Sequence, residues 1–297
     1  MLQTLLNALA LGAVYALMAV GIGLVFGVLR LVNFAYGQLI MAGAFSLAVT
    51  SEHGWPDWAS LLTCVAVVVA LSLLMEVAVF RPLRGASPTT MLVATFAVAF
   101  LLQAVALLKF GSLGKIATIY PGLFDPVADS GRFATVRWIT IVAIVCGVVA
   151  LGGLTLLLER TSIGLHMRAA AADFQTARLL GVNANRVITL AVVLSGVLAA
   201  AVSVILVVQT PLVVPSFALR DTIIVLVGVV VGGMDRLWTA TLGGFSIGVA
   251  TSIFTDKLPT DATVYVDSFV FALVIAVLLL RPNGLFAPRS ARPVERA

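Results

Sequence analysis

The stretch ERTSIGLHMRAAAADFQTARLLGVNANR, residues 159–186, separates two long uncharged apolar runs, 138–158 and 187–208. It contains four arginines, at positions 160, 168, 178 and 186. Its middle is rich in Ala and Leu, which favour helix. Ser162 is a candidate N-cap, and Gly181 is a candidate residue for ending the helix. The pattern therefore predicts a short helix that lies outside the membrane between two membrane-spanning helices.

The composition of the chain excludes a soluble globular protein. Of its 297 residues, 61% are hydrophobic and 10% are charged, whereas soluble domains contain about 25% charged residues. The formal net charge of +5 comes from Lys and Arg spread over short loops. Such a distribution is typical of a membrane protein and argues against nucleic-acid binding. The composition therefore indicates a polytopic membrane protein.

Apolar runs along the chain predict its membrane-spanning helices, each of which needs about 20 apolar residues. The runs cover residues 5–28, 29–50, 59–80, 89–108, 138–158, 187–208, 221–233, 239–254 and 266–280. The run 29–50 is unusually polar and the run 221–233 is short, so one or both are predicted to be broken or re-entrant. We expect an all-α protein forming one transmembrane domain over residues 1–297, with about eight or nine spanning helices and a cytoplasmic coupling helix.

Lys and Arg residues predict the orientation of the chain, because loops on the cytoplasmic side are enriched in them. If the loops alternate through nine crossings with 159–186 inside, 12 of the 18 Lys and Arg residues face the cytoplasm. The tail 281–297 is then also cytoplasmic, and the N-terminus lies outside. If 29–50 or 221–233 is re-entrant, the number of crossings falls, and loss of the crossing at 29–50 would move the N-terminus to the other side.

Polar residues inside the apolar runs are few. The sequence contains no motif of a hydrolase or a nucleotide-binding loop, and its two His and two Cys residues are well separated. We therefore expect no catalytic residue, metal site or bound cofactor. The candidate substrate path consists of polar and small residues within the runs: Tyr15, Asn33, Tyr36, Gln38, Gly43, Thr241, Gly243 and Gly244. The alternative is that the glycines serve helix packing and the amides make hydrogen bonds between helices.

The loop 159–186 is the candidate site for receiving energy from a soluble partner. The predicted spans contain no series of Asp, Glu or His residues that could relay protons, which argues against a proton-driven transporter. The energy for transport must therefore come from elsewhere. The residues expected to form the coupling surface are Gly164, Leu165, Arg168, Ala169, Ala172, Asp173, Ala177, Leu180 and Gly181. The alternative is a solvated helix that merely connects two spans.

Five motifs give the chain a family resemblance over nearly its whole length. They are GAVYALMAVGIGLVFGVLRLVNFAYGQLIMAGAF (12–45), MEVAVFRPLR (75–84), GLHMRAAAADFQTARLLGVNANRV (164–187), VVGGMDRLWTATLGG (230–244) and LLLRPNGLF (278–286). The chain resembles the permease subunits of branched-chain amino-acid ABC importers, the leucine, isoleucine and valine type. The resemblance implies a multi-pass subunit of the bacterial inner membrane, surrounded by membrane lipid, that is not itself an enzyme.

The resemblance also implies partners for this subunit. They are a second, related permease, two cytoplasmic ATP-binding subunits that carry ATP and magnesium, and a periplasmic binding protein that delivers a branched-chain or similar hydrophobic amino acid. The chain departs from the family pattern, since Tyr36 and Gln38 stand where His and Glu are usual. Urea or short amides are therefore alternative substrates. A self-sufficient channel or facilitator is the alternative from another class.

Overall fold

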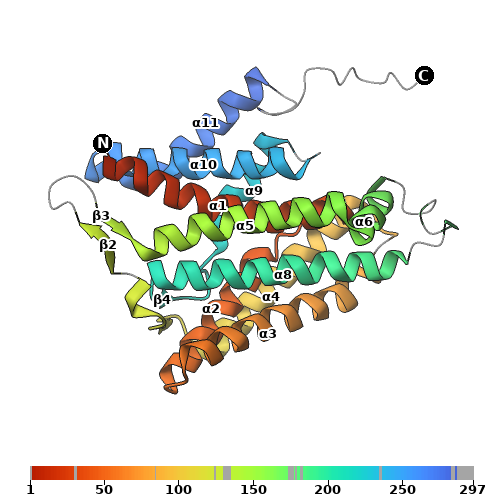
Figure 1. Ribbon diagram of the computed structural model, residues 1–297, viewed down its shortest axis with the longest axis horizontal. Helices are drawn as coiled ribbons and strands as arrows, with labels where there is room; N and C mark the ends of the chain where they lie inside the picture. Colours follow the sequence, from red (N-terminus) through yellow and green to blue (C-terminus); the bar gives the residue numbers. More distant parts are fainter. Residues whose placement is uncertain are drawn as a thin grey trace.

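The computed structural model describes residues 2–29, 32–83, 85–123, 125–129, 135–172, 177, 179–180, 183–233, 236–281 and 285. The described helices are α1 (Leu2–Leu29), α2 (Tyr36–Glu52), α3 (Asp57–Met75), α4 (Pro88–Phe110), α5 (Trp138–Arg160), α6 (Ser162–Ala172), α8 (Ala184–Gln209), α9 (Leu219–Gly232), α10 (Leu237–Lys257) and α11 (Val266–Leu280) (Figure 1). A π-helix, Glu76–Phe80, continues α3, and the 3-10 helices are Pro121–Leu123 and Thr260–Tyr265. The strands are β1 (Lys115–Ile116), β2 (Pro126–Asp129), β3 (Thr135–Arg137) and β4 (Leu212–Val213).

Seven helical segments of the described chain are long and apolar enough to cross a membrane: α1, α3 with its π-helix, α4, α5, α8, α10 and α11. The other two predicted apolar runs form the short helices α2, with 17 residues, and α9, with 14 residues. At 1.5 Å per residue these are about 25 and 21 Å long, less than the roughly 30 Å of a bilayer's hydrocarbon core. The runs 29–50 and 221–233, of which one or both are predicted to be broken or re-entrant, therefore correspond to the two short helices.

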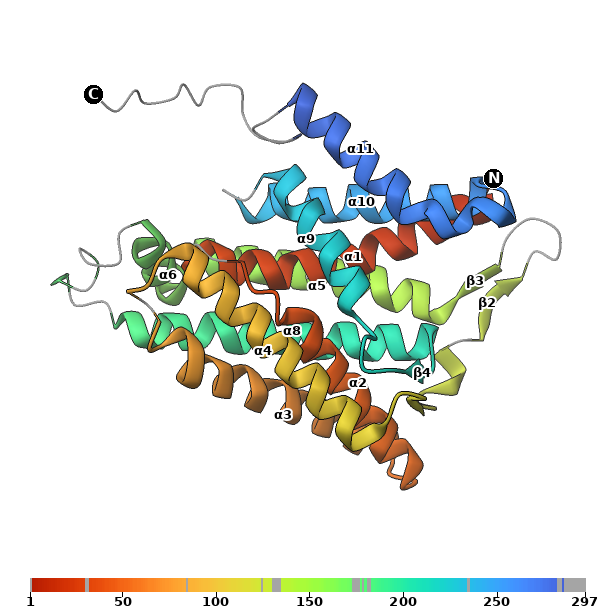
Figure 2. The ribbon, with the colours of Figure 1, turned by 180° about the vertical axis from the view of Figure 1, so that it is seen from behind.

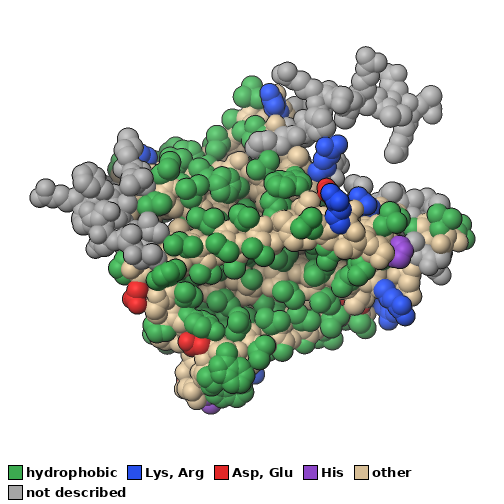
Figure 3. All heavy atoms as spheres, in the orientation of Figure 1, with side chains coloured by type: hydrophobic (Ala, Val, Ile, Leu, Met, Phe, Trp, Pro, Cys, Tyr) green, Lys and Arg blue, Asp and Glu red, His purple; other side chains and the backbone are tan. Residues whose placement is uncertain are grey.

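Helix α1 occupies the centre of the bundle, where it packs against α5, α8, α9 and α10. In the most apolar 18-residue stretch of α1, 78% of the residues are buried, compared with 11% in the corresponding stretch of α5. Helices such as α5 expose their apolar side chains on the outside of the bundle, as Figure 3 shows for one face. Exposure of this kind is what lipid contact requires.

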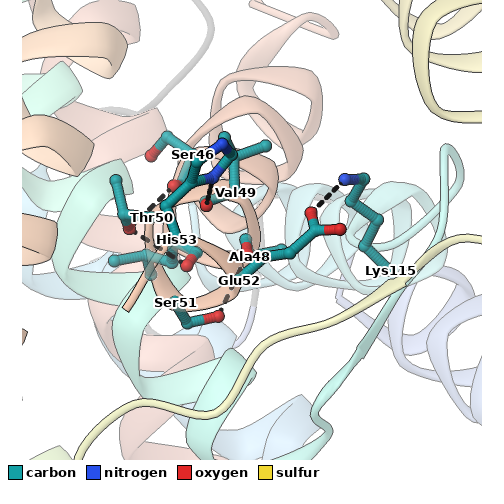
Figure 4. A network of polar contacts seen from close by, with 9 residues as sticks. Ser46, Ala48, Val49, Thr50, Ser51, Glu52, His53 and Lys115 are labelled. Carbon is teal, nitrogen blue, oxygen red and sulfur yellow. Dashed lines mark hydrogen bonds and ion pairs between the residues drawn. The ribbon is translucent and has the colours of Figure 1, made fainter. Parts of the chain in front are cut away.

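One end of the bundle is closed by contacts between loops. Strand β1 pairs with β4 in antiparallel fashion, with Lys115 opposite Val213. The Lys115 ammonium donates to the Glu52 carboxylate at the end of α2, beside His53, whose Nδ1 lies 2.7 Å from the Val49 carbonyl oxygen (Figure 4). These contacts join the loop after α4, the loop after α8 and the end of α2.

The two ends of the bundle differ in what they carry. Strands β2, β3 and β4 and the beginning of α1 lie at one end, and α6 lies at the other (Figures 1 and 2). On the face drawn in Figure 3, most of the visible Lys and Arg side chains gather at the end with α6. The alternating loops predicted from charge, and the side of the membrane on which each end lies, stay predictions. The cytoplasmic tail predicted for 281–297 lies outside the described residues except for positions 281 and 285.

Candidate functional site

The turn before α2 places polar residues of the run 29–50 inside the bundle. Asn33 is 2% exposed, and its Oδ1 accepts a 3.0 Å hydrogen bond from the Ala35 N–H. The Phe34 N–H donates to Thr95 Oγ1 at 3.4 Å. The Tyr36 N–H donates to the Asn33 carbonyl at 3.4 Å. Asn33 therefore organises the start of α2, and its side-chain oxygen is already engaged by the backbone.

A cavity of about 20 Å³ lies between the start of α2, the middle of α4 and the first turn of α9. These helices appear together in Figure 2. The aromatic wall of the cavity is formed by Phe34, Phe96 and Phe100, with the ring centroids of Phe34 and Phe96 3.9 Å apart. Its polar lining is formed by Gln38, Gln103 and Thr222. The lining includes no Lys, Arg, Asp or Glu of the described chain.

Two residues of the cavity lining each have a buried polar atom without a hydrogen-bond partner among the residues that the structure describes. Gln38 and Thr222 are each 1% exposed, and the two atoms are Gln38 Oε1 and Thr222 Oγ1. A Cβ atom placed on Gly37 would lie 2.4 Å from Thr222 Oγ1, so the glycine lets α2 approach α9 closely. Gln38 was expected in the substrate path. Thr222 was missed, because a threonine in an apolar run has no distinguishing sequence signal.

Tyr36 and Tyr15 lie apart from this cavity lining, and both are buried. The Tyr36 hydroxyl packs against α1, where a Cβ on Gly21 would lie 2.1 Å from it, and it has no hydrogen-bond partner in the described chain. The Tyr15 hydroxyl donates to Asp221 Oδ1 at 2.8 Å. The sequence reasoning missed Asp221. The available signal was an acid at the start of an apolar run too short to span a membrane.

The small residues of the candidate path lie at helix contacts. A Cβ on Gly43 would lie 2.5 Å from Ser203 Oγ of α8, and one on Gly243 would lie 2.2 Å from the Gly228 carbonyl of α9. A Cβ on Gly244 would lie 2.6 Å from the Ala19 Cβ of α1. Thr241 Oγ1 donates to the Leu237 carbonyl of its own helix at 2.8 Å. These four residues support close packing, and their place in a substrate path remains a prediction.

Helix α6 is held against the end of α5 by a sharp turn. The Gly164 N–H donates to Thr161 Oγ1 at 3.0 Å, so Thr161 fills the capping role expected of Ser162. A Cβ on Gly164 would lie 2.3 Å from the carbonyl oxygens of both Leu157 and Leu158. Only glycine permits this approach.

The faces of α6 differ in burial. Gly164, Met167 and Ala170 are buried, whereas Leu165 and Arg168 are exposed and Ala169 is half-buried. Beyond the helix, Ala177 is buried and Leu180 is 79% exposed. Asp173, Gly181 and the side chain of Ala172 lie outside the described part of the chain. Of the described residues expected to form the coupling surface, Gly164 and Ala177 are therefore buried within this chain. Leu165, Arg168 and Leu180 are exposed and accessible to a partner.

Comparisons with known proteins identify relatives along the whole chain. Residues 4–278 match the family described as "Branched-chain amino acid transport system / permease component". The chain is 32% identical over 294 residues to the high-affinity branched-chain amino acid transport system permease protein BraD of Pseudomonas aeruginosa, covering 96% of this chain and 95% of that protein. It is 28% identical over 297 residues to the corresponding protein LivH of Escherichia coli K12, with coverages of 96% and 94%.

A solved structure resembles the fold. PsaBC from Streptococcus pneumoniae in complex with Fab superimposes with a TM-score of 0.52 at 13% identity, covering 94% of this chain and 92% of that one. At this identity the likeness concerns the fold alone.

Proposed function

Because the chain belongs to the family of branched-chain amino acid transport system permease components, we propose that it is the permease subunit of an ABC importer for branched-chain or similar hydrophobic amino acids. The chain is a multi-pass inner-membrane transport subunit and not an enzyme. It acts as one transmembrane domain. Its energy comes from the hydrolysis of ATP, which partner subunits bind together with magnesium.

The exposed side of α6 is the observation that carries this proposal. Leu165 in α6 and Leu180, which follows α6 in the chain, are 57% and 79% exposed, and α6 lies at one end of the bundle (Figure 1). Apolar side chains exposed to water are typical of a surface that binds a protein. Arg168 lies on the same side and provides a charged rim.

The mechanism follows from how α6 is attached. It follows α5 directly after the turn at Thr161, and its buried side packs against α5, α8 and α1. A movement of a partner bound to α6 is therefore transmitted to three helices of the bundle. We assign this partner role to two cytoplasmic ATP-binding subunits. A second, related permease completes the membrane part, and a periplasmic binding protein delivers the substrate at the opposite end.

The test is reconstitution of the complete assembly in lipid vesicles. Leucine-loaded binding protein should stimulate ATP hydrolysis and drive leucine uptake. Ala169→Trp should abolish both, because it adds bulk to the half-buried edge of α6, whereas Ala169→Ser, which conserves volume, should retain them. Membrane insertion of both variants is checked by assembly of the complex.

Three results would contradict the proposal. Leucine uptake by this chain without ATP-binding subunits would identify a facilitator. Stimulation by a binding protein loaded with urea or a short amide, but not with leucine, would change the substrate class. Wild-type coupling in Ala169→Trp would make α6 a connector only.

A further inference from the structure

We propose that the cavity between α2, α4 and α9 is an ammonium subsite, which holds the amino group of the amino acid during its passage. This inference rests on the proposed function and adds to it the orientation of the substrate. It starts from two unpartnered buried atoms, Gln38 Oε1 and Thr222 Oγ1, that belong to residues of the cavity lining. A polar atom buried without a hydrogen bond is unfavourable, so a ligand with N–H groups gains from binding there.

The two unpartnered atoms can both accept a hydrogen bond, and the amides of Gln38 and Gln103 and the Thr222 hydroxyl also carry donor groups. At the start of α2 the N–H groups of Phe34, Ala35, Tyr36 and Gln38 all donate to acceptors of this chain. In the first turn of α9 the N–H of Thr222 donates to the Ala218 carbonyl. The beginnings of these two helices therefore have few donors left for an anion. Gln38 Oε1 can only accept, and a threonine hydroxyl can accept as well.

The electrostatic surroundings also favour a cation. The faces of aromatic rings attract ammonium groups, and three phenylalanines form the wall. Next to Thr222 in the chain, Asp221 contributes an acid whose Oδ1 accepts from Tyr15. The neighbouring cation, Arg220, is engaged by Asp267 through two hydrogen bonds. No basic side chain of the described residues lines the cavity, so a carboxylate would find no counter-charge there.

The size of the cavity fits a head group and nothing larger. Its volume of about 20 Å³ exceeds the roughly 10–15 Å³ that one water molecule needs, and an ammonium group is of similar size. An entire leucine does not fit. The amino group therefore enters the cavity while the aliphatic side chain lies against the aromatic wall, of which Phe100 is 64% exposed.

The test measures ligand binding to the assembled transporter in nanodiscs without its binding protein, by saturation-transfer NMR. Three probes separate the head groups: leucine, 3-methylbutylamine, which lacks the carboxylate, and 4-methylpentanoate, which lacks the amine. Leucine and the amine should bind saturably and compete with each other, and the acid should not bind.

Variants then assign the binding to this cavity. Gln38→Leu and Thr222→Val should each weaken amine binding about tenfold, the scale of one hydrogen bond to a charged group. Gln38→Glu should strengthen it by at least a similar factor, because a carboxylate replaces a neutral amide. The matched control is Thr251→Val. Thr251 is 4% exposed, but its hydroxyl donates to the Ile247 carbonyl of its own helix at 2.8 Å, so amine binding should not change.

The outcomes distinguish this inference from the proposed function. Binding of the acid in place of the amine, weaker amine binding in Gln38→Glu, or unchanged binding in both Gln38→Leu and Thr222→Val would each overturn the ammonium subsite. Stimulation of ATP hydrolysis by the loaded binding protein would still stand in those cases. Loss of that stimulation in the wild-type assembly would instead overturn the proposed function.

Discussion

The hydroxyl of Tyr15, in the centre of α1, donates a 2.8 Å hydrogen bond to Oδ1 of Asp221, in the first turn of α9. The next residue back, Arg220, donates from Nε to Asp267 of α11 at 2.7 Å. Consecutive residues of α9 therefore bind two different helices. Because α9 is too short to span the membrane by itself, these polar contacts fix its beginning between α1 and α11.

We predict that Tyr15→Phe destabilises the bundle. The substitution keeps the ring and removes the only described donor to Asp221 Oδ1. Leaving this partly buried acceptor without its donor costs roughly 1–3 kcal/mol, so the midpoint of thermal unfolding of the solubilised protein should fall by several degrees. Tyr265→Phe is the control, because Tyr265 is 60% exposed. Equal midpoints for the wild type and Tyr15→Phe would show that the contact does not stabilise the fold.

The ion pair between Glu52, the last residue of α2, and Lys115 predicts that the stability of the fold depends on pH. The hydrogen bond from Lys115, together with its charge, lowers the pKa of Glu52 below its ordinary value. A lowered folded-state pKa means that the pair stabilises the fold above the unfolded pKa, and that this stability is lost as pH falls through the folded pKa. The effect is small because Glu52 is exposed to solvent and Lys115 is only partly buried.

The measurement compares unfolding midpoints of the wild type and Glu52→Gln across pH. The difference should be largest near neutral pH and should vanish in acid, below the usual carboxyl range of about 4. In a Lys115→Met background, Glu52→Gln should have no effect at any pH. A difference that grows as the pH falls would contradict the assignment.

How much of this structure the sequence could predict depends on whether a feature is local. The nine apolar runs became helices, because the length of an apolar stretch is a local property. The beginning of α2 was placed too early, at residue 29 in place of Tyr36, because the run contains no Pro to end it. Its true start depends on Asn33, whose side chain caps the turn from two residues away.

Contacts between distant residues were beyond the sequence. Tyr15 and Asp221 are 206 positions apart, and no periodicity connects them. Gln38 could be singled out because an amide in an apolar run needs a partner, whereas its neighbour in the cavity, Thr222, could not. Gly243 illustrates another limit, since helix packing and a substrate path both call for a small side chain.

We predict that Gly243→Ala destabilises the contact between α9 and α10. The added Cβ would lie 2.2 Å from the Gly228 carbonyl oxygen and 2.6 Å from the Gly232 Cα. Both neighbours are backbone, which cannot rotate away, and overpacking of this kind costs about 1–3 kcal/mol. Gly153→Ala is the control, since nothing lies within 4 Å of a Cβ there. If both variants unfold at the wild-type midpoint, Gly243 is free of packing constraint and its small size serves another purpose.

The last prediction concerns Gly164, where α6 turns against the end of α5. A methyl group at this position would lie 2.3 Å from two carbonyl oxygens, those of Leu157 and Leu158. Gly164→Ala therefore forces α6 away from α5, while the spans themselves keep their contacts. If movement of α6 carries the coupling, the variant should insert and assemble normally but lose the stimulation of ATP hydrolysis by loaded binding protein.

The matched control is Gly152→Ala, a glycine of α5 at which a Cβ would meet nothing within 4 Å. Leucine uptake by reconstituted Gly164→Ala should fall at least about tenfold, the equivalent of roughly 1.4 kcal/mol, whereas Gly152→Ala should transport like the wild type. Basal ATP hydrolysis should remain in both, because we propose that partner subunits carry it out. Wild-type uptake by Gly164→Ala would show that the close approach of α6 to α5 is not part of coupling. A loss of assembled complex in Gly164→Ala would show that the turn stabilises the fold and does not merely transmit force.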